Sequence, residues 1–347
     1  MGARDRIASL LHRSGALAAT LRVRALGPAS SAVIVTYHHV CEPDADYPFD
    51  PDVADVTPDQ FRRQVELLAE HFTIIDLATL ADGLDGAPLP KNPCAITFDD
   101  GYRSNLTAAL PALVAVGATA TFFIATGFTT RRRLYWWDRI AYLVHHATTP
   151  RLTLRYPSEV TLDTTDRAAA RATLVKLVKN TRALDLERFL VELAAAGGVP
   201  WDAARERALA DQLIMTWDEV RALAAAGMSI ESHTRDHRVL ETMAPAELAD
   251  DLAGARAELA REVGGRAGRA LAYPVGRTIA RYPAVRGAVA AAGYRLGFTN
   301  ASGPIDLRQR TRLDRLDLPR VAVDRSLSDS MFLAQLALPA LAYTRDA

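Results

Sequence analysis

Two adjacent carboxylates in this 347-residue chain, Asp99 and Asp100, could bind a cation or transfer a proton. Asp99 and Asp100 directly follow an apolar run and precede Gly101, which allows the chain to turn sharply. Adjacent carboxylates repel each other, so the pair is costly unless a cation or a proton relieves the repulsion. Taken alone, the same residues could also form a turn and the N-cap of the next helix.

A pair of histidines forms the second group. His233 and His237 also follow an apolar run, and histidines four apart on a helical turn lie close enough to share one divalent ion. The spacing alone is weak evidence. Together with one carboxylate, two imidazoles leave open metal positions for water and substrate, which is the layout of a catalytic site. The same ligand set also serves non-haem iron oxygenases, a less favoured reading because those ligands usually lie on a β scaffold.

The elements that must position these residues are short β-branched runs alternating with helical patterns, which indicates an α/β fold. Each expected strand ends in polar or turn residues, and the strands are 31–37, 72–75, 94–98, 118–124, 228–231, 270–273 and 295–299. Thr57 with Gln60, and Thr216 with Glu219, predict capping boxes at two helix starts.

The expected strands also predict the domain organisation. We expect an N-terminal helical extension at 1–29, a barrel domain at 30–325 and a C-terminal apolar helix or tail at 326–347. About 100 residues separate two successive strands, whereas a strand–helix–strand unit needs about 30. An insertion is therefore expected at 127–214, and periodicity at 168–177, 186–196 and 203–213 predicts that it is helical.

Composition limits the possible partners. The 41 basic and 41 acidic side chains cancel, so no basic field would attract a nucleic acid, and no such partner is expected. Cys41 and Cys94 cannot make a disulfide framework.

The chain termini raise the question of a membrane. The apolar run 7–11 is stopped by His12 and Arg13, so no cleavable signal is expected, and no run reaches the length of a membrane span. This favours a cytoplasmic or membrane-peripheral location. The run 15–21 predicts a helix that covers the domain or, alternatively, lies on an anionic membrane surface; the run 331–343 predicts a docking helix or an interfacial anchor. The oligomeric state is not predicted.

The chain resembles the polysaccharide deacetylases with a NodB homology domain, carbohydrate esterase family 4. The resemblance covers roughly residues 30–300 and rests on the segments 37–40, 61–68, 97–102, 119–124, 215–219, 232–237 and 272–276. It implies an irregular (β/α) barrel of about seven parallel strands. It also implies a metal-dependent hydrolase that removes N-acetyl groups from amino sugars of the N-acetylglucosamine type, in a polysaccharide or a glycan precursor.

The resemblance implies roles for individual residues. Asp100, His233 and His237 would bind one divalent metal, most of all zinc, although cobalt, nickel or iron suit the same ligands. Asp99 would be the general base. Val275 matches the position whose backbone N–H would contact the acetyl carbonyl oxygen.

Two further residues are candidate substrate contacts. Tyr273 lies within the matching segment, and Trp137 follows another tryptophan, so the two indoles could stack on a sugar or could simply be packing anchors.

The sequence also departs from the family pattern. Ala272 stands where an arginine usually orients the base, and Arg277 is a candidate substitute. The usual C-terminal acid has no counterpart, since no histidine follows His237. His38 is the best candidate, because it ends the first strand and resembles the position proposed as the acid in exopolysaccharide deacetylases. The alternative is a catalytically silent, metal-containing carbohydrate-binding domain; the presence of Asp99 argues against it.

Overall fold

The computed structural model describes residues 2–265 and 267–342, and it divides into two compact units. The first unit comprises the residues up to Glu42, Asp55–Thr130 and the residues from Met215 onward. The second comprises Pro43–Ala54 and Arg131–Ile214. Residues 343–347 of the expected C-terminal tail lie outside the described residues.

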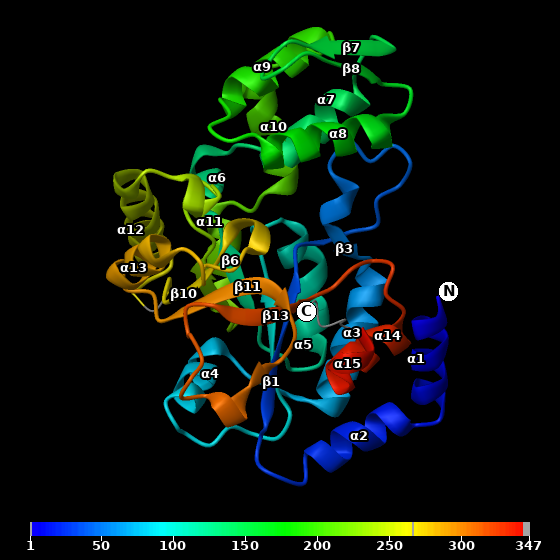
Figure 1. The fold of residues 1–347 in the computed structure, drawn as a ribbon, viewed down its shortest axis with the longest axis vertical. Helices are drawn as coiled ribbons and strands as arrows, with labels where there is room; N and C mark the ends of the chain where they lie inside the picture. The colour runs from blue at the N-terminus through cyan, green and yellow to red at the C-terminus, as the bar shows by residue number, and fades with distance from the viewer. Residues whose placement is uncertain (1, 266, 343–347) are drawn as a thin grey trace. The chain divides into compact units, whose positions relative to one another are not determined.

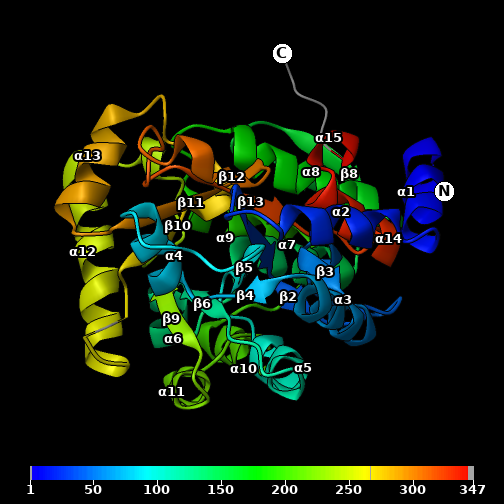
Figure 2. The ribbon, with the colours of Figure 1, turned by 90° about the horizontal axis from the view of Figure 1, so that it is seen from below.

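Seven parallel strands close into a barrel in the first unit (Figures 1 and 2). In order around the barrel they are β1 (Ser31–Tyr37), β13 (Leu318–Ala322), β11 (Leu296–Ser302), β10 (Ala270–Ala272), β9 (Ser229–Ser232), β6 (Thr121–Ile124) and β5 (Pro93–Phe98). Pairing of β5 with β1 closes the ring. The expected α/β barrel of about seven parallel strands is therefore confirmed.

One strand of the ring is not the expected one. The strand expected at 72–75 is β4 (Thr73–Ile74), which pairs with the start of β5, while β6 pairs with the end of β5. The seventh barrel strand is β13, which no expectation covered. Short strands flank the ring: β12 (Ile305–Asp306) pairs antiparallel with β1, and β2 (His39–Val40) pairs with β3 (Ala54–Val56).

Alternation along the strands separates the barrel interior from its outer layer. Phe123 on β6 contacts Phe298 on β11 with ring centroids 5.8 Å apart, although two strands lie between them in the sheet order. This contact places both rings in the interior, where they form one buried cluster with Ala95 on β5 and Leu318 on β13. Helix α4 (Leu77–Leu84) contributes buried leucines to the same cluster.

The remaining helices of the first unit surround the barrel or flank it. They are α1 (Ala3–Arg13), α2 (Ala16–Arg24), α3 (Pro58–His71), α5 (Leu110–Ala115), α11 (Trp217–Ala225), α12 (Pro245–Glu262), α13 (Pro283–Ala291), α14 (Asp329–Ala337) and α15 (Pro339–Ala342), while α6 (Thr126–Arg131) runs to the boundary of the unit. Both expected capping boxes are confirmed, at the starts of α3 and α11. None of the helices in the described ranges is long and apolar enough to cross a membrane.

The second unit has its own hydrophobic core, formed among others by Ile140, Leu174 and Phe189. Its helices are α7 (Trp136–His145), α8 (Arg167–Asn180), α9 (Leu186–Ala196) and α10 (Ala203–Leu213). It also contains an antiparallel pair, β7 (Arg151–Leu154) and β8 (Val160–Asp163), which the helical periodicity did not predict.

Removing one aromatic ring from the outer layer of the barrel tests this packing. Phe122 on β6 is fully buried and stacks on Phe98 with centroids 4.7 Å apart. We expect Phe122→Ala to lower the free energy of unfolding by about 3–5 kcal/mol, because a cavity replaces the ring. Urea unfolding measures this. Val114→Ala, at an exposed position on α5, is the control and should change stability by less than about 0.5 kcal/mol.

Candidate active site

The turn after β5 separates the two adjacent carboxylates. The Asp99 N–H donates to the Tyr37 carbonyl at 2.8 Å, which continues the pairing of β5 with β1 by one residue. Asp100 and Gly101 then adopt left-handed conformations, with φ of 73° and 80°. A Cβ at Gly101 would lie 3.1 Å from Ile124 Cδ1, so the turn favours glycine on both counts. Both aspartates are buried, and each is directed to its own cationic or imidazole partners.

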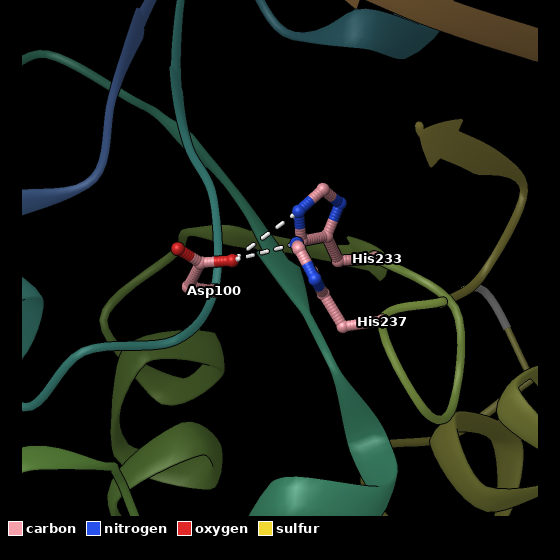
Figure 3. A group of neighbouring side chains, drawn as sticks. All are labelled: Asp100, His233 and His237. Atoms are coloured by element: carbon pink, nitrogen blue, oxygen red, sulfur yellow. Dashed lines mark ion pairs between the residues drawn. The ribbon is translucent and has the colours of Figure 1, made fainter. Parts of the chain in front are cut away.

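Asp100 faces the two histidines (Figure 3). Its Oδ1 lies 3.3 Å from His233 Nε2 and 3.4 Å from His237 Nε2. The three potential ligand atoms all lie within 4.8 Å of one another, and all three residues are buried. The predicted grouping of these three side chains is therefore present.

The histidines do not lie on a helical turn, so that part of the expectation is wrong. They lie on an irregular loop that follows β9, in which Thr234 and His237 are left-handed, with φ of 65° and 48°. The His237 N–H donates to Thr234 Oγ1 at 3.0 Å, which supports this loop. The loop brings both rings to Asp100 from one side.

The protonation of this group suits a divalent metal. His233 Nδ1 lies 2.8 Å from the Ala272 carbonyl, which can only accept, so Nδ1 donates to it and Nε2 is the ring nitrogen that faces Asp100. Burial, reinforced by His233, lowers the pKa of His237 to about 3, so this ring is neutral at pH 7. Burial alone would raise the pKa of Asp100, but the histidines reverse the effect and hold it below its usual range. One carboxylate and two imidazoles, with a nitrogen of each ring facing the carboxylate, therefore fit a metal such as zinc.

Asp99 has a different partner. Its Oδ1 and Oδ2 accept from Arg320 Nη1 and Nη2 at 2.8 and 2.6 Å, and Arg320 is fully buried on β13. The guanidinium also donates to the Thr299 carbonyl and to Asn300 Oδ1, both on β11. Burial by itself would raise the pKa of Asp99, but Arg320, with His233 and His38, outweighs burial and holds it well below its usual range. Asp99 is therefore ionised at neutral pH.

Arg320 is the residue that the sequence analysis missed. Arg277, the expected substitute for the usual arginine, is half exposed and pairs with Glu241 at 2.9 Å instead. The available signal was a lone arginine in the apolar run 318–322, directly after Pro319.

His38 lies between two carboxylates. Its Nδ1 is 2.8 Å from Asp55 Oδ2, and its Nε2 is 4.0 Å from Asp99 Oδ2. Burial would lower the pKa of His38, but the charges of Asp55, Asp100 and Asp99 and the hydrogen bond that the ring donates to Asp55 raise it to about 10. The ring is therefore protonated at neutral pH, and about a quarter of it remains exposed. Asp55, on β3, was not among the expected site residues.

The remaining candidates have different surroundings. Val275 is left-handed, with φ of 56°, in the short turn Pro274–Gly276 that follows β10, a rare conformation for a β-branched residue. Tyr273 is buried, its hydroxyl donates to the Leu316 carbonyl at 2.5 Å, and its side chain packs in the core. Trp137, in the second unit, is mostly buried and stacks on Tyr135 with centroids 4.5 Å apart, which is the arrangement of a packing anchor.

Comparison with known proteins identifies the family of this chain. The family model described as polysaccharide deacetylase matches residues 86–146 and 189–297. The chain belongs to the polysaccharide deacetylase family and is a deacetylase, a hydrolase that acts on a carbohydrate substrate. Comparison with curated protein sequences gives no match.

Solved structures share the fold. The deacetylase PplD from Streptococcus pyogenes, in complex with acetate, aligns with a TM-score of 0.57 at 18% identity, over 89% of this chain and 99% of that one. IcaB from Ammonifex degensii aligns with a TM-score of 0.52 at 18% identity, over 91% and 98%. The polysaccharide deacetylase BA0330 from Bacillus anthracis, described as putative, aligns with a TM-score of 0.55 at 14% identity, over 88% and 69%.

The buried ion pair generates a stability prediction. Arg320→Gln leaves Asp99 buried without its cation, so we expect unfolding at pH 7 to cost about 3–5 kcal/mol less than in the unaltered protein. The folded pKa of Asp99 is depressed, so the pair stabilises the fold above the unfolded pKa of about 3.9 and loses this effect as the pH falls further. The stability difference should therefore narrow below pH 4.

Urea unfolding at pH 7 and at pH 3.5 measures this difference. Arg277→Gln is the matched control, since it removes an arginine from a half-exposed ion pair and should cost less than about 1 kcal/mol. Equal losses of unfolding free energy in the two variants would show that the buried Asp99–Arg320 pair stabilises the fold no more than the half-exposed pair does.

Proposed function

We propose that this protein removes N-acetyl groups from amino sugars of the N-acetylglucosamine type in a polysaccharide or a glycan precursor, with one divalent ion, zinc above all, held by Asp100, His233 and His237. The proposal rests on two groups that lie at the carboxyl ends of the barrel strands: the three candidate metal ligands, and the ion pair of Asp99 with Arg320. Barrel enzymes have their active sites on this face. A bound divalent ion would lower the pKa of a coordinated water and polarise the acetyl carbonyl.

Asp99 acts as the general base. It is ionised at neutral pH, and both of its oxygens are fixed by Arg320. A carboxylate oxygen has more than one acceptor site, so the ion pair leaves a lone pair on Asp99 for the proton of the attacking water. Arg320 is a positioning residue, since it acts through Asp99.

His38 acts as the general acid. Asp55 holds its Nδ1 at 2.8 Å, which leaves Nε2 turned toward Asp99 and the reacting groups. The water oxygen bonds to the acetyl carbon as Asp99 takes the proton of the water, and the carbonyl double bond opens onto its oxygen. As that double bond re-forms, the carbon–nitrogen bond breaks, and the protonated His38 ring donates its proton to the departing amine. The products are acetate and the free amino sugar.

The Val275 N–H stabilises the developing charge on the carbonyl oxygen. The donor belongs to the main chain, and the left-handed turn at Val275 fixes its direction. The backbone conformation at this position is therefore more important for the reaction than the identity of the side chain.

The alternative, a silent carbohydrate-binding domain, is less well supported. Such a domain has no use for a base held by a buried arginine or for a histidine held by a buried carboxylate, and this chain has both. Acetate release distinguishes the two functions.

Two aspartate variants test the division of roles. We expect Asp100→Ala to lose both metal binding and activity, because it removes a ligand. Asp99→Asn should retain the metal and lower kcat by about 10²- to 10⁴-fold, because the base is lost. Acetate release from N-acetylglucosamine oligomers, with each divalent metal added back to stripped protein, measures activity, and elemental analysis measures the metal. Normal turnover by Asp99→Asn would contradict the mechanism.

A third variant tests the acid through its pH dependence. Asp55→Asn removes the carboxylate that raises the pKa of His38, so this pKa falls and the ring loses its proton at lower pH. We expect the alkaline limb of the kcat/KM profile to move down by about one pH unit or more. His38→Ala should abolish that limb and slow the reaction while metal content is unchanged. An unaltered profile in both variants would assign the acid elsewhere.

A further inference from the structure

The outward surface of the two N-terminal helices is unusually apolar for this protein. Eight large hydrophobic side chains are exposed among the described residues, and four of them lie close together in the sequence: Ile7 and Leu10 on α1, and Val23 and Leu26 on or just after α2. Their exposed fractions run from 47% to 81%. We call these four side chains the N-terminal apolar stripe.

Two pairs of exposed apolar residues share the same spacing. Ile7 and Leu10 are three residues apart on α1, and residues three or four apart lie on the same helix face, so α1 presents one apolar row to solvent. Val23 lies near the end of α2, and Leu26 lies in the turn that follows this helix. The opposite faces are buried, at Ala8 on α1 and at Leu17 and Leu21 on α2. The segment therefore has apolar side chains on its outward side as well as on its inward one.

Contacts with α14 fix which face of α1 points outward. The Ser328 hydroxyl donates to Asp5 Oδ1 at 2.6 Å, and His12 Nδ1 lies 2.9 Å from Ser330 Oγ. Both views show α1 beside α14 (Figures 1 and 2). Because α1 packs against α14, Ile7 and Leu10 point to solvent from a folded helix.

Basic residues surround the stripe. Arg4, Arg6, Arg13 and Arg22 are all exposed, and none of them forms an ion pair with a carboxylate of the described residues. The fifth arginine of the segment, Arg24, is used structurally, since it donates to Asn92 Oδ1 at 2.8 Å.

The acidic side chains of the segment do not offset this charge. Asp5 is the single acidic residue among residues 2–27, and Ser328 donates to it. The whole chain has no net charge, so this corner carries a local positive excess.

From this combination we infer that the outward faces of α1 and α2 bind the surface of an anionic lipid bilayer. Exposed aliphatic side chains enter the boundary between headgroups and acyl chains, and arginines at the edge of the stripe contact the lipid phosphates. A second copy of the chain is the less suitable occupant, because pairing this surface with itself would bring unpaired arginines together. The surface is separate from the active site, so this inference does not depend on the proposed deacetylation.

Vesicle sedimentation with the full chain tests the inference. We expect binding to vesicles of phosphatidylcholine and phosphatidylglycerol mixed three to one, weaker binding at high salt, and little binding to phosphatidylcholine alone. The variant I7S/L10S/V23S/L26S should bind at least about tenfold more weakly, and so should R4Q/R6Q/R22Q. The matched controls V114S/V191S and R207Q/R310Q/R312Q alter exposed residues elsewhere and should bind as the unaltered protein does.

Several results would overturn the inference. These are no binding to anionic vesicles, equal binding to neutral ones, and binding that the stripe and arginine variants leave unchanged. A dimer in light scattering that the stripe variant dissociates, without vesicle binding, would assign the surface to a second copy. Far-UV circular dichroism confirms that each variant is folded. The Asp100→Ala variant should still bind vesicles, which separates failure of this inference from failure of the proposed function.

Discussion

Two buried carboxylates that are neighbours in the chain are the constraint on which the site depends. Asp99 and Asp100 are 1% and 2% exposed. Two carboxylates buried side by side can both stay ionised only if each has its own partner that stabilises the negative charge. The left-handed turn at Asp100 and Gly101 sends one to Arg320 and the other to His233 and His237. Without Arg320, burial would favour the protonated form of Asp99, which could not accept a proton from water.

Closure of the barrel supplies the arginine. Asp99 directly follows β5 and Arg320 lies on β13, and these strands become near neighbours because β1 pairs with both. Side chains an even number of residues apart on a strand point to the same face. Asp99 is four residues after Ala95, and Arg320 is two after Leu318, so both point to the interior face. His38, at the end of β1, reaches the same face from the strand between them. The base, its guanidinium partner and the acid therefore come from three adjacent strands that lie far apart in the sequence.

Much of this arrangement was predictable from local sequence. Six of the seven barrel strands, the two capping boxes and the grouping of Asp100 with both histidines follow from periodicity, turn residues and the resemblance. The strand β13 did not follow, because Pro319 and a charged residue interrupt its apolar run. For the same reason Arg277 was predicted in place of Arg320.

Asp55 was missed because it lies 17 residues from His38, and no local pattern links a carboxylate to a histidine at that distance. The left-handed loop that carries His233 and His237 was missed because their spacing also fits a helix.

The central claim is that Asp100, His233 and His237 hold a metal while Asp99 pairs with Arg320. The most direct measurement is anomalous diffraction at the zinc absorption edge from crystals of zinc-loaded protein. The account predicts one strong peak, about 2.0–2.2 Å from an Asp100 oxygen and from Nε2 of each histidine, with Asp99 still bound to Arg320. A peak ligated by Asp99 in place of Asp100, or no peak among these three residues at saturating zinc, would contradict it.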